Sequence, residues 1–307
     1  MSVLSEPQYH GEEAAYAFVE AHIWANGRVC PHCGVFDKSG PLKGKSTRIR
    51  LYQCYACRKP FTVKIGTIFE ASHVKLHIWL QAIFLLCSSK KGISSNQLHR
   101  ILGVTLKTAW FMSHRIREAM REGKLPGGLG GEGKFVEVDE TFVGGKAKNR
   151  VYAKELPRHE PVVALVERKG RVASFHVPTV NATNLKPILK EQISPKSHLR
   201  TDESGVYLGV GRDFASHETV NHSAKGYVRG DAYTNTVEGY FSILKRGIYG
   251  VHHHVSQEHL KQYLAEFDFH YNERIALGVD DVERAARALR GVVGKRLTYR
   301  TAHRAGA

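Results

Sequence analysis

Residues 134–145 read KFVEVDETFVGG, and at this stretch the chain changes from helical patterns to strand patterns. Successive side chains of a strand point to opposite faces, so Glu137 and Asp139 share one face. The strands that follow come first as an antiparallel pair and then alternate with helices. This order predicts a mixed α/β domain built in layers.

Turn signals and apolar runs define the other elements of this domain, which is expected to span residues 134–275. A hairpin is predicted over residues 160–178, with its turn at Lys169 and Gly170. Helices are predicted over residues 181–193, 235–248 and 257–274, and further strands within 197–205 and 217–223.

A helical region is predicted over residues 73–123, before a glycine-rich linker at 124–133. A turn at Gly103 separates its second and third helices, and Ser95 and Thr105 are their expected N-caps. Helix, short glycine turn and helix resembles a helix-turn-helix. Any compact three-helix domain gives the same pattern, so DNA contact and simple packing both remain open interpretations.

Four of the five cysteines form two Cys-x-x-Cys pairs within residues 1–72. The pairs are Cys30 with Cys33 and Cys54 with Cys57, and twenty residues separate them. Each pair can hold one side of a tetrahedral zinc ion, and the spacer suits a short hairpin. Four thiolates leave no open position for water, so the sequence predicts a structural zinc ribbon, preceded by a helix.

The chain is strongly basic, with 45 Lys and Arg against 29 Asp and Glu and a formal net charge of +16. Such an excess favours a polyanionic partner, and nucleic acid is the commonest one. Hydrophobic residues make up 42% of the chain, so a buried core is expected. We see no membrane-spanning run and no signal peptide, so a reducing, cytoplasmic location is expected.

Three acidic residues stand at positions suited to metal-dependent chemistry. Asp139 lies in the first strand after the linker, Asp202 where a strand meets a loop, and Glu238 at the start of a helix. Phosphoryl transfer on DNA uses two divalent cations, and magnesium prefers carboxylate oxygens. Residues far apart in sequence can converge at one edge of a sheet to build such a site.

Each of these acids also has a simpler interpretation. Glu137 shares a face with the first acid and has the same chemistry. Asp202 would serve equally well as a helix cap, and its neighbour Glu203 offers an equal carboxylate. With Asn235 as N-cap, Glu238 falls at N3 and would complete a capping box. Spacing alone favours the cap for Glu238.

Taken together, the motifs resemble the transposases of bacterial insertion sequences that join an amino-terminal zinc ribbon to a ribonuclease-H-like DDE catalytic domain. The matching segments are CPHC (30–33), CYAC (54–57), VEVDETFVGGK (136–146), TDESGVY (201–207) and longer blocks at 220–256 and 259–274. The resemblance covers nearly the whole chain, and the longer blocks are its most specific part. It implies Asp139, Asp202 and Glu238 as the catalytic triad, with Mg²⁺ or Mn²⁺ as cofactor.

The resemblance also implies residues that hold DNA. Lys245 follows Glu238 by seven positions, which returns to the same stripe of a helix, and DDE enzymes often place a basic residue there. Arg246, beside it, is expected to contact DNA as well. The loop with His252, His253 and His254 is a further expected DNA contact. A zinc site is the alternative interpretation, although three adjacent histidines cannot all face one ion.

The leading hypothesis is therefore a DNA transposase that cleaves insertion-element ends and joins them to target DNA by two-metal phosphoryl transfer. Its expected partner is double-stranded DNA, bound by a homo-oligomer associated with the bacterial nucleoid. Residues 276–307 are expected to form a basic C-terminal tail. Two alternatives stay open: a non-catalytic DNA-binding regulator, and a ribonuclease-H-like nuclease that acts on another nucleic acid.

Overall fold

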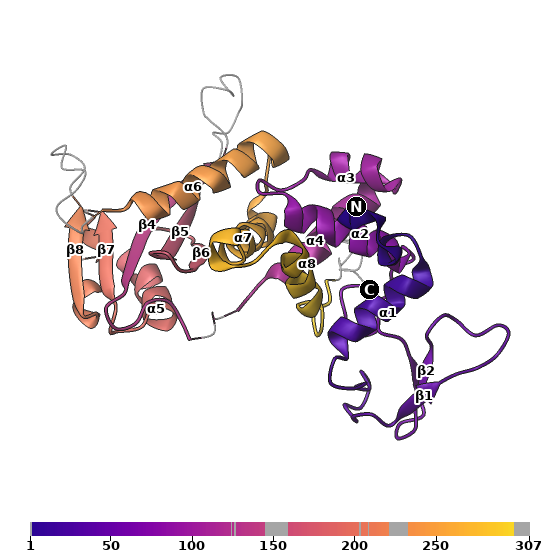
Figure 1. Cartoon of the computed structure of the whole chain (residues 1–307). Coiled ribbons are helices and arrows are strands. Elements are labelled where there is room, and N and C mark those ends of the chain that lie inside the picture. The colour runs from indigo at the N-terminus through magenta and orange to yellow at the C-terminus, as the bar shows by residue number, and fades with distance from the viewer. Residues whose placement is uncertain are drawn as a thin grey trace, which may run out of the picture. The chain divides into compact units, whose positions relative to one another are not determined.

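The chain forms two compact units in the computed structural model, and each unit has its own sheet and helices (Figure 1). One unit comprises Met1–Arg121 with Val279–Ala307, and the other comprises Glu122–Gly278. The structure describes residues 2–123, 125, 127–144, 159–202, 204–207, 209–220 and 233–297.

The unit Glu122–Gly278 is built on a five-stranded mixed sheet with the strand order β6-β5-β4-β7-β8. The strands are β4 (Phe135–Gly144), β5 (His159–Glu167), β6 (Val172–His176), β7 (His198–Asp202) and β8 (Ser216–Val220). β5 runs antiparallel to β4 and β6, whereas β7 runs parallel to β4 and β8. β4 is therefore the central strand. The next two strands, β5 and β6, lie on one side of it, and β7 and β8 lie on the other.

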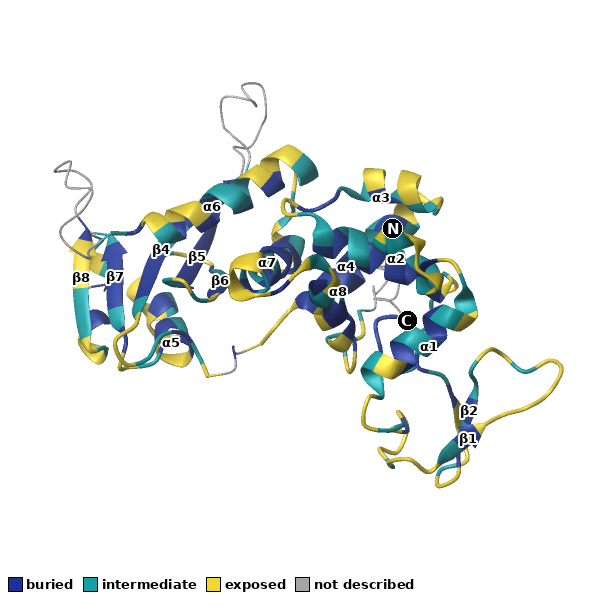
Figure 2. Cartoon of the chain, in the orientation of Figure 1, coloured by how far each residue is buried: buried dark blue, intermediate teal, exposed yellow. Residues whose placement is uncertain are grey.

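Helices cover both faces of this sheet (Figure 1). They are α5 (Ala182–Gln192) on one face, and α6 (Asn235–Gly247) and α7 (Gln257–Asn272) on the other. Val136 and Val138 of β4 join the core beneath α5, whereas Val143 joins the core beneath α6 and α7. β5 is buried on both faces (Figure 2), because its apolar residues run without interruption from 162 to 166.

Helix α7 is fixed to the edge strand β6 by side chains. The amide of Asn272 bonds to both backbone groups of Val172, at 2.7 and 3.0 Å. Asp268 accepts hydrogen bonds from the backbone N–H and the hydroxyl of Ser174, and from the hydroxyl of Tyr240 in α6. These bonds satisfy backbone groups of an edge strand and hold the two helices against the sheet.

The other unit begins with α1 (Glu12–Ile23) and a three-stranded antiparallel sheet of β1 (Ser39–Pro41), β2 (Tyr52–Cys54) and β3 (Pro60–Phe61). The sheet has a small aromatic core, in which Trp24 packs edge-to-face on Tyr52 and Phe61. The hydroxyl of Tyr52 donates to Glu20 of α1 at 2.9 Å, so the ribbon is anchored to this helix.

The helices that follow are α2 (Leu76–Ser88), α3 (Ser95–Leu102) and α4 (Leu106–Met120). Thr105 caps α4 as predicted, and Gly103 ends α3 in the left-handed conformation. The predicted cap at Ser95 is wrong by one residue, because the hydroxyl of Ser94 accepts the N–H of Gln97. Ser94 and Ser95 are equally good caps by residue type, and the sequence does not separate them.

The segment after residue 276, expected as a basic tail, contains helix α8 (Asp281–Arg290). Arg284 is buried, donates to the carbonyl of Cys87 in α2 at 3.0 Å, and pairs with Asp281. Ala288 and Leu289 are buried as well. Basic composition suggests a solvated segment, but long arginine stems can be buried when the guanidinium finds acceptors.

The predicted fold class is confirmed: a mixed α/β layer fold with a separate small cysteine ribbon and a helical region. The predicted strand at 217–223 corresponds to β8 as far as Val220, and its last residues lie outside the described part of the chain. Among the helices that the structure describes, none is long and apolar enough to cross a bilayer.

Candidate active site and zinc centre

The four paired cysteines come together in the ribbon. Sγ of Cys30 lies 3.7 Å from Sγ of Cys57, and Sγ of Cys33 lies 3.7 Å from Sγ of Cys54. All four sulfur atoms lie within 4.8 Å of one another. Sulfur atoms at about 2.3 Å from a tetrahedral zinc ion are about 3.8 Å apart, so these thiols fit the predicted Zn²⁺.

At Cys54 the backbone favours the thiolate form, which is the form that binds zinc, whereas at Cys33 the Val35 N–H is outweighed by burial and the neighbouring thiols, which raise the pKa. The N–H groups of Cys57 and Ala56 donate to Cys54 and lower the pKa of its thiol to about 7. Each Cys-x-x-Cys loop is followed directly by a residue with positive φ, Gly34 (φ 72°) and Arg58 (φ 58°). Both loops therefore turn sharply after their second cysteine.

Two of the predicted catalytic acids lie on the neighbouring strands β4 and β7, just beyond the last paired residues. These strands pair in parallel, with Glu137 opposite Arg200 as the last pair. The same register, continued by two residues, places Asp139 level with Asp202 on the same face of the sheet. Both acids thus lie where the two strands part, at the point of the sheet where open α/β folds bind ligands.

Glu137 has a different role, because its carboxylate accepts hydrogen bonds from the first N–H groups of α6. It accepts the backbone N–H groups of Thr236 and Val237 at 2.8 and 3.0 Å, and the hydroxyl of Thr236 at 2.9 Å. Arg168 donates its Nε to the same carboxylate at 2.6 Å, and the Glu137 side chain is 0% exposed. A negative charge is favourable at a helix N-terminus, so these contacts account for Glu137 without a metal.

Glu238 lies in the first turn of α6 and is exposed. The predicted capping box is wrong, because the N-cap is Thr234 rather than Asn235 and Glu238 falls one position beyond N3. The hydroxyl of Thr234 donates to the Glu238 carboxylate at 3.1 Å. Since α6 begins beside Glu137, Glu238 lies on the same side of the sheet as Asp139.

The charges of the three acids act on one another. Burial raises the pKa of Asp139 to about 7, against the opposing effect of the Glu140 backbone N–H. The negative charges of Glu140, Asp202 and Glu238 raise this pKa further. Carboxylates that repel one another are stabilised by a divalent cation, and carboxylate oxygens suit Mg²⁺ or Mn²⁺.

The three acids share one side of the sheet, but their carboxylate oxygens lie farther apart than the sulfur atoms of the cysteine cluster. Within the described ranges, the four thiols are the one group of three or more ligating side chains whose donor atoms all lie within 4.8 Å. One oxygen of Asp202 also accepts the N–H of Ser204 at 3.1 Å, so the cap interpretation of Asp202 holds in part. Its neighbour Glu203 lies outside the described residues.

Glu140 points to the opposite face of β4, towards α5. It accepts a hydrogen bond from the hydroxyl of Tyr207 at 2.5 Å, and burial raises the pKa of Glu140. Tyr207 is itself fully buried at the end of the short helix that follows Asp202. The Glu140–Tyr207 bond therefore ties the loop after Asp202 to the strand that carries Asp139.

The predicted DNA-binding residues lie on α6 and just beyond it. Lys245 follows Glu238 by seven positions, a rise of about 10 Å along one helix. Arg246 is exposed and bonds back to Ser242. His253 is exposed in the connection to α7, with a φ of 60°. DNA binding by these three residues stays a prediction.

The sequence analysis missed Arg168, which joins two parts of the site. Its guanidinium bonds to Glu137 and to the carbonyl of Tyr233, and lies 3.5 Å from the centre of the Tyr233 ring. Arg168 precedes the hairpin turn at Lys169 and Gly170, where a basic residue is usually solvated. No local signal in the sequence identifies it.

Two known transposase domain families match parts of this chain. Residues 128–272 match the model of the ISXO2-like transposase domain, a range that contains Asp139, Asp202 and Glu238. Residues 10–60 match the transposase zinc-ribbon domain, a range that contains the four clustered cysteines.

Two relatives among known proteins are similar over most of their own length. An uncharacterized protein in transposable element ISH50 of Halobacterium salinarum is 28% identical over 264 residues, covering 80% of this chain and 85% of the relative. An uncharacterized transposase-like protein of Haemophilus influenzae is 28% identical over 104 residues, covering 34% of this chain and 83% of the relative.

Proposed function

For a chain that carries an ISXO2-like transposase domain and a transposase zinc ribbon, we propose a DNA transposase that cleaves the ends of its element and joins them to target DNA. The observation that carries the proposal is that three acids lie around the point where strands β4 and β7 separate. Asp139 is level with Asp202 where β4 and β7 part, and Glu238 begins the helix above the same face.

The three acids are the ligands in this proposal. Asp139, Asp202 and Glu238 would hold Mg²⁺ or Mn²⁺, which supplies activation of the attacking oxygen and neutralises charge on the leaving oxygen. Asp139 has to lose its proton to serve, and its raised pKa means that binding a cation and releasing a proton are coupled. Glu137, Arg168 and Thr236 hold α6, and with it Glu238, in register with β4.

The proposed reaction has two steps of the same kind. In the first, a water oxygen bonds to the phosphorus at the element end, and the bond from phosphorus to the 3′ oxygen breaks, which leaves a 3′-hydroxyl. In the second, that hydroxyl attacks a phosphorus of the target DNA and displaces another 3′ oxygen. No side chain has to form a covalent intermediate, and the residues of the site serve to position the reacting groups.

DNA is held by basic residues outside the acid cluster. Lys245 and Arg246 of α6 and the exposed His253 are the proposed contacts near the site. Neutralising DNA phosphates with such residues gives affinity without sequence preference. Since two ends and a target meet in one reaction, we propose that the active form is a homo-oligomer assembled on DNA.

The direct test uses the full chain and a labelled duplex that carries the DNA flanking its own gene. With Mg²⁺ or Mn²⁺ we expect nicking at a defined position and a new 3′-hydroxyl, detected by extension with terminal transferase. Sequence-specific binding without nicking in either metal would support a DNA-binding regulator instead. Preferential cleavage of RNA–DNA hybrids would support a nuclease with another substrate.

A further inference from the structure

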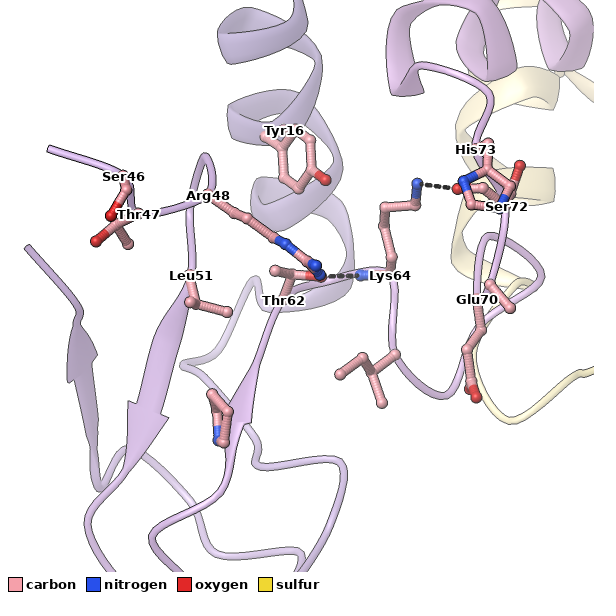
Figure 3. A pocket seen from close by; sticks show the side chains of 13 residues that line it. Tyr16, Ser46, Thr47, Arg48, Leu51, Thr62, Lys64, Glu70, Ser72 and His73 are labelled. Atoms are coloured by element: carbon pink, nitrogen blue, oxygen red, sulfur yellow. Dashed lines mark hydrogen bonds between the residues drawn. The ribbon is translucent and has the colours of Figure 1, made fainter. Parts of the chain in front are cut away.

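A pocket lined by both apolar and polar side chains lies in the amino-terminal unit, beside the zinc ribbon (Figure 3). It encloses about 800 Å³ between the β1–β2 hairpin, helix α1 and the segment 60–73. Figure 3 shows Arg48 reaching from the hairpin below Tyr16, and Lys64 reaching from the opposite wall. Two cations from different segments therefore line one hollow.

Lys64 is the cation with unmet bonding capacity. Its ammonium donates to the carbonyl of Ser72 at 2.9 Å, and this is its one hydrogen-bond acceptor among the described residues. An ammonium has three N–H donors, so two remain for another partner. Burial lowers the pKa of Lys64 and outweighs the stabilising negative charge of Glu12, which means that removal from water disfavours the Lys64 charge. An anion in the pocket would stabilise that charge.

Arg48 supplies a second, more accessible cation. Its guanidinium is exposed and makes no hydrogen bond or ion pair in the part of the chain that the structure describes. Its charge acts on the phenol of Tyr16, which lies above it in Figure 3. A guanidinium offers five N–H donors in a fork that matches phosphate oxygens.

The acid in the pocket wall does not cancel these charges. Glu70 accepts the backbone N–H of Gly66 at 2.9 Å with one oxygen, and pairs with Arg296 at 3.3 Å through the other. The remaining polar groups of the lining include the hydroxyls of Ser46, Thr47 and Thr62, which can donate to phosphate oxygens. The part of the pocket that carries these cations and hydroxyls is thus suited to an anion.

We infer that this pocket binds a phosphodiester of the DNA backbone, with Lys64 and Arg48 on its oxygens. The inference rests on the proposed function, because DNA is the partner on which the transposase acts. A backbone contact here would fix the position of the ribbon on the duplex and would not read bases. The net charge of +16 is consistent with several such contacts over the chain.

The test is DNA binding by the full chain as a function of salt. Lys64→Gln and Arg48→Gln are compared with Lys43→Gln, an exposed lysine of the same hairpin that does not line the pocket. Each pocket variant should weaken binding about three- to tenfold near 100 mM salt, equally for specific and unrelated duplexes. Each should reduce the slope of log K against log salt by about 0.9, whereas Lys43→Gln should leave the slope unchanged.

Two variants control for loss of folding in Lys64→Gln, which changes a half-buried side chain. Lys64→Arg keeps the charge and should restore the salt slope, and Arg48→Gln changes only an exposed side chain. Slopes equal to wild type in both Gln variants would overturn the inference. Binding of inorganic phosphate that is lost in Lys64→Gln, with unchanged DNA affinity, would overturn it by assigning the pocket to a small anion.

The outcomes also separate this inference from the proposed function. A wild-type protein that nicks its element ends, with pocket variants that bind DNA like wild type, rejects the pocket alone. A wild-type protein that neither binds nor cleaves DNA rejects both proposals.

Discussion

Thr236 donates both its backbone N–H and its hydroxyl to the carboxylate of Glu137. Glu137 lies two residues before Asp139 on β4, and Thr236 lies two residues before Glu238 on α6. The spacing between two proposed metal ligands is therefore set by a neighbouring pair that need not touch the metal. Glu137 and Thr236 therefore position the site, whereas Asp139 and Glu238 are the residues proposed to act in it.

Glu137→Ala should be strongly destabilising, because it leaves Arg168 and the first N–H groups of α6 without their buried acceptor. We expect a loss of about 3–5 kcal/mol in the free energy of unfolding, measured by urea denaturation. Thr236→Val removes only the hydroxyl bond and should cost about 1 kcal/mol. Glu191→Ala, on the exposed side of α5, is the matched control and should change stability by less than about 0.5 kcal/mol. An unchanged unfolding curve for Glu137→Ala would contradict the role assigned to this residue.

Asp139→Asn, unlike Glu137→Ala, should stabilise the fold. The folded protein holds the Asp139 proton up to a pH of about 7, whereas an ordinary aspartate releases it near 3.8. The ionised carboxylate thus lowers the free energy of unfolding as the pH rises through this window. In metal-free protein at a pH of about 8, Asp139→Asn should raise Tm by a few degrees, or ~1–2 kcal/mol, and abolish cleavage.

The control for Asp139→Asn is Asp213→Asn, which removes a carboxylate from a partly exposed ion pair with Lys190. Its effect on Tm should be small. A lower Tm for Asp139→Asn at this pH, or a rise that persists at a pH of about 3, would be inconsistent with the raised pKa.

Zinc should be needed for the ribbon but not for the fold of the sheet unit. Cys54→Ser is expected to remove the bound zinc, measured by atomic absorption after dialysis, because a Cys₄ site needs all four thiolates. The aromatic core around Trp24 should loosen, seen as a red shift of tryptophan emission. Cys87→Ala, in α2, should keep its zinc. Full zinc content in Cys54→Ser would show that the cluster is not the zinc site.

Lys245→Gln should weaken DNA binding about three- to tenfold near 100 mM salt and lower the salt slope by about 0.9. The reason is the loss of one phosphate contact near the proposed catalytic acids. Lys186→Gln is the matched control, because Lys186 is exposed on α5, across the sheet from α6. Equal losses in the two variants would indicate a diffuse electrostatic effect and no specific contact at Lys245.

Local patterns made much of the fold predictable. Alternation marked β4, and the Lys169–Gly170 turn marked the β5–β6 hairpin. The cysteine spacing predicted a cluster that the structure contains. Helix caps were less certain, because Ser94 with Ser95, and Thr234 with Asn235, are adjacent residues of good capping type.

The contacts that organise the candidate site could not be predicted, because they join residues far apart in sequence. Glu137 and Thr236 are 99 positions apart, and Arg168 reaches Tyr233 across 65 positions. Glu137 and Asp139 looked interchangeable because strand alternation gives them the same face. Only the position of α6 distinguishes them, since its N-terminus uses the Glu137 carboxylate and leaves Asp139 beside Asp202.

In the proposed site, Glu238 is a catalytic ligand and more than a partner of Thr234. The most direct test compares Glu238→Gln with Glu258→Gln, an exposed acid in the first turn of α7, in metal-dependent nicking of the labelled element end. We predict that Glu238→Gln binds the DNA and keeps the wild-type Tm but does not nick it, while Glu258→Gln nicks normally. Wild-type nicking by Glu238→Gln would show that the carboxylate is not a ligand and would contradict the account.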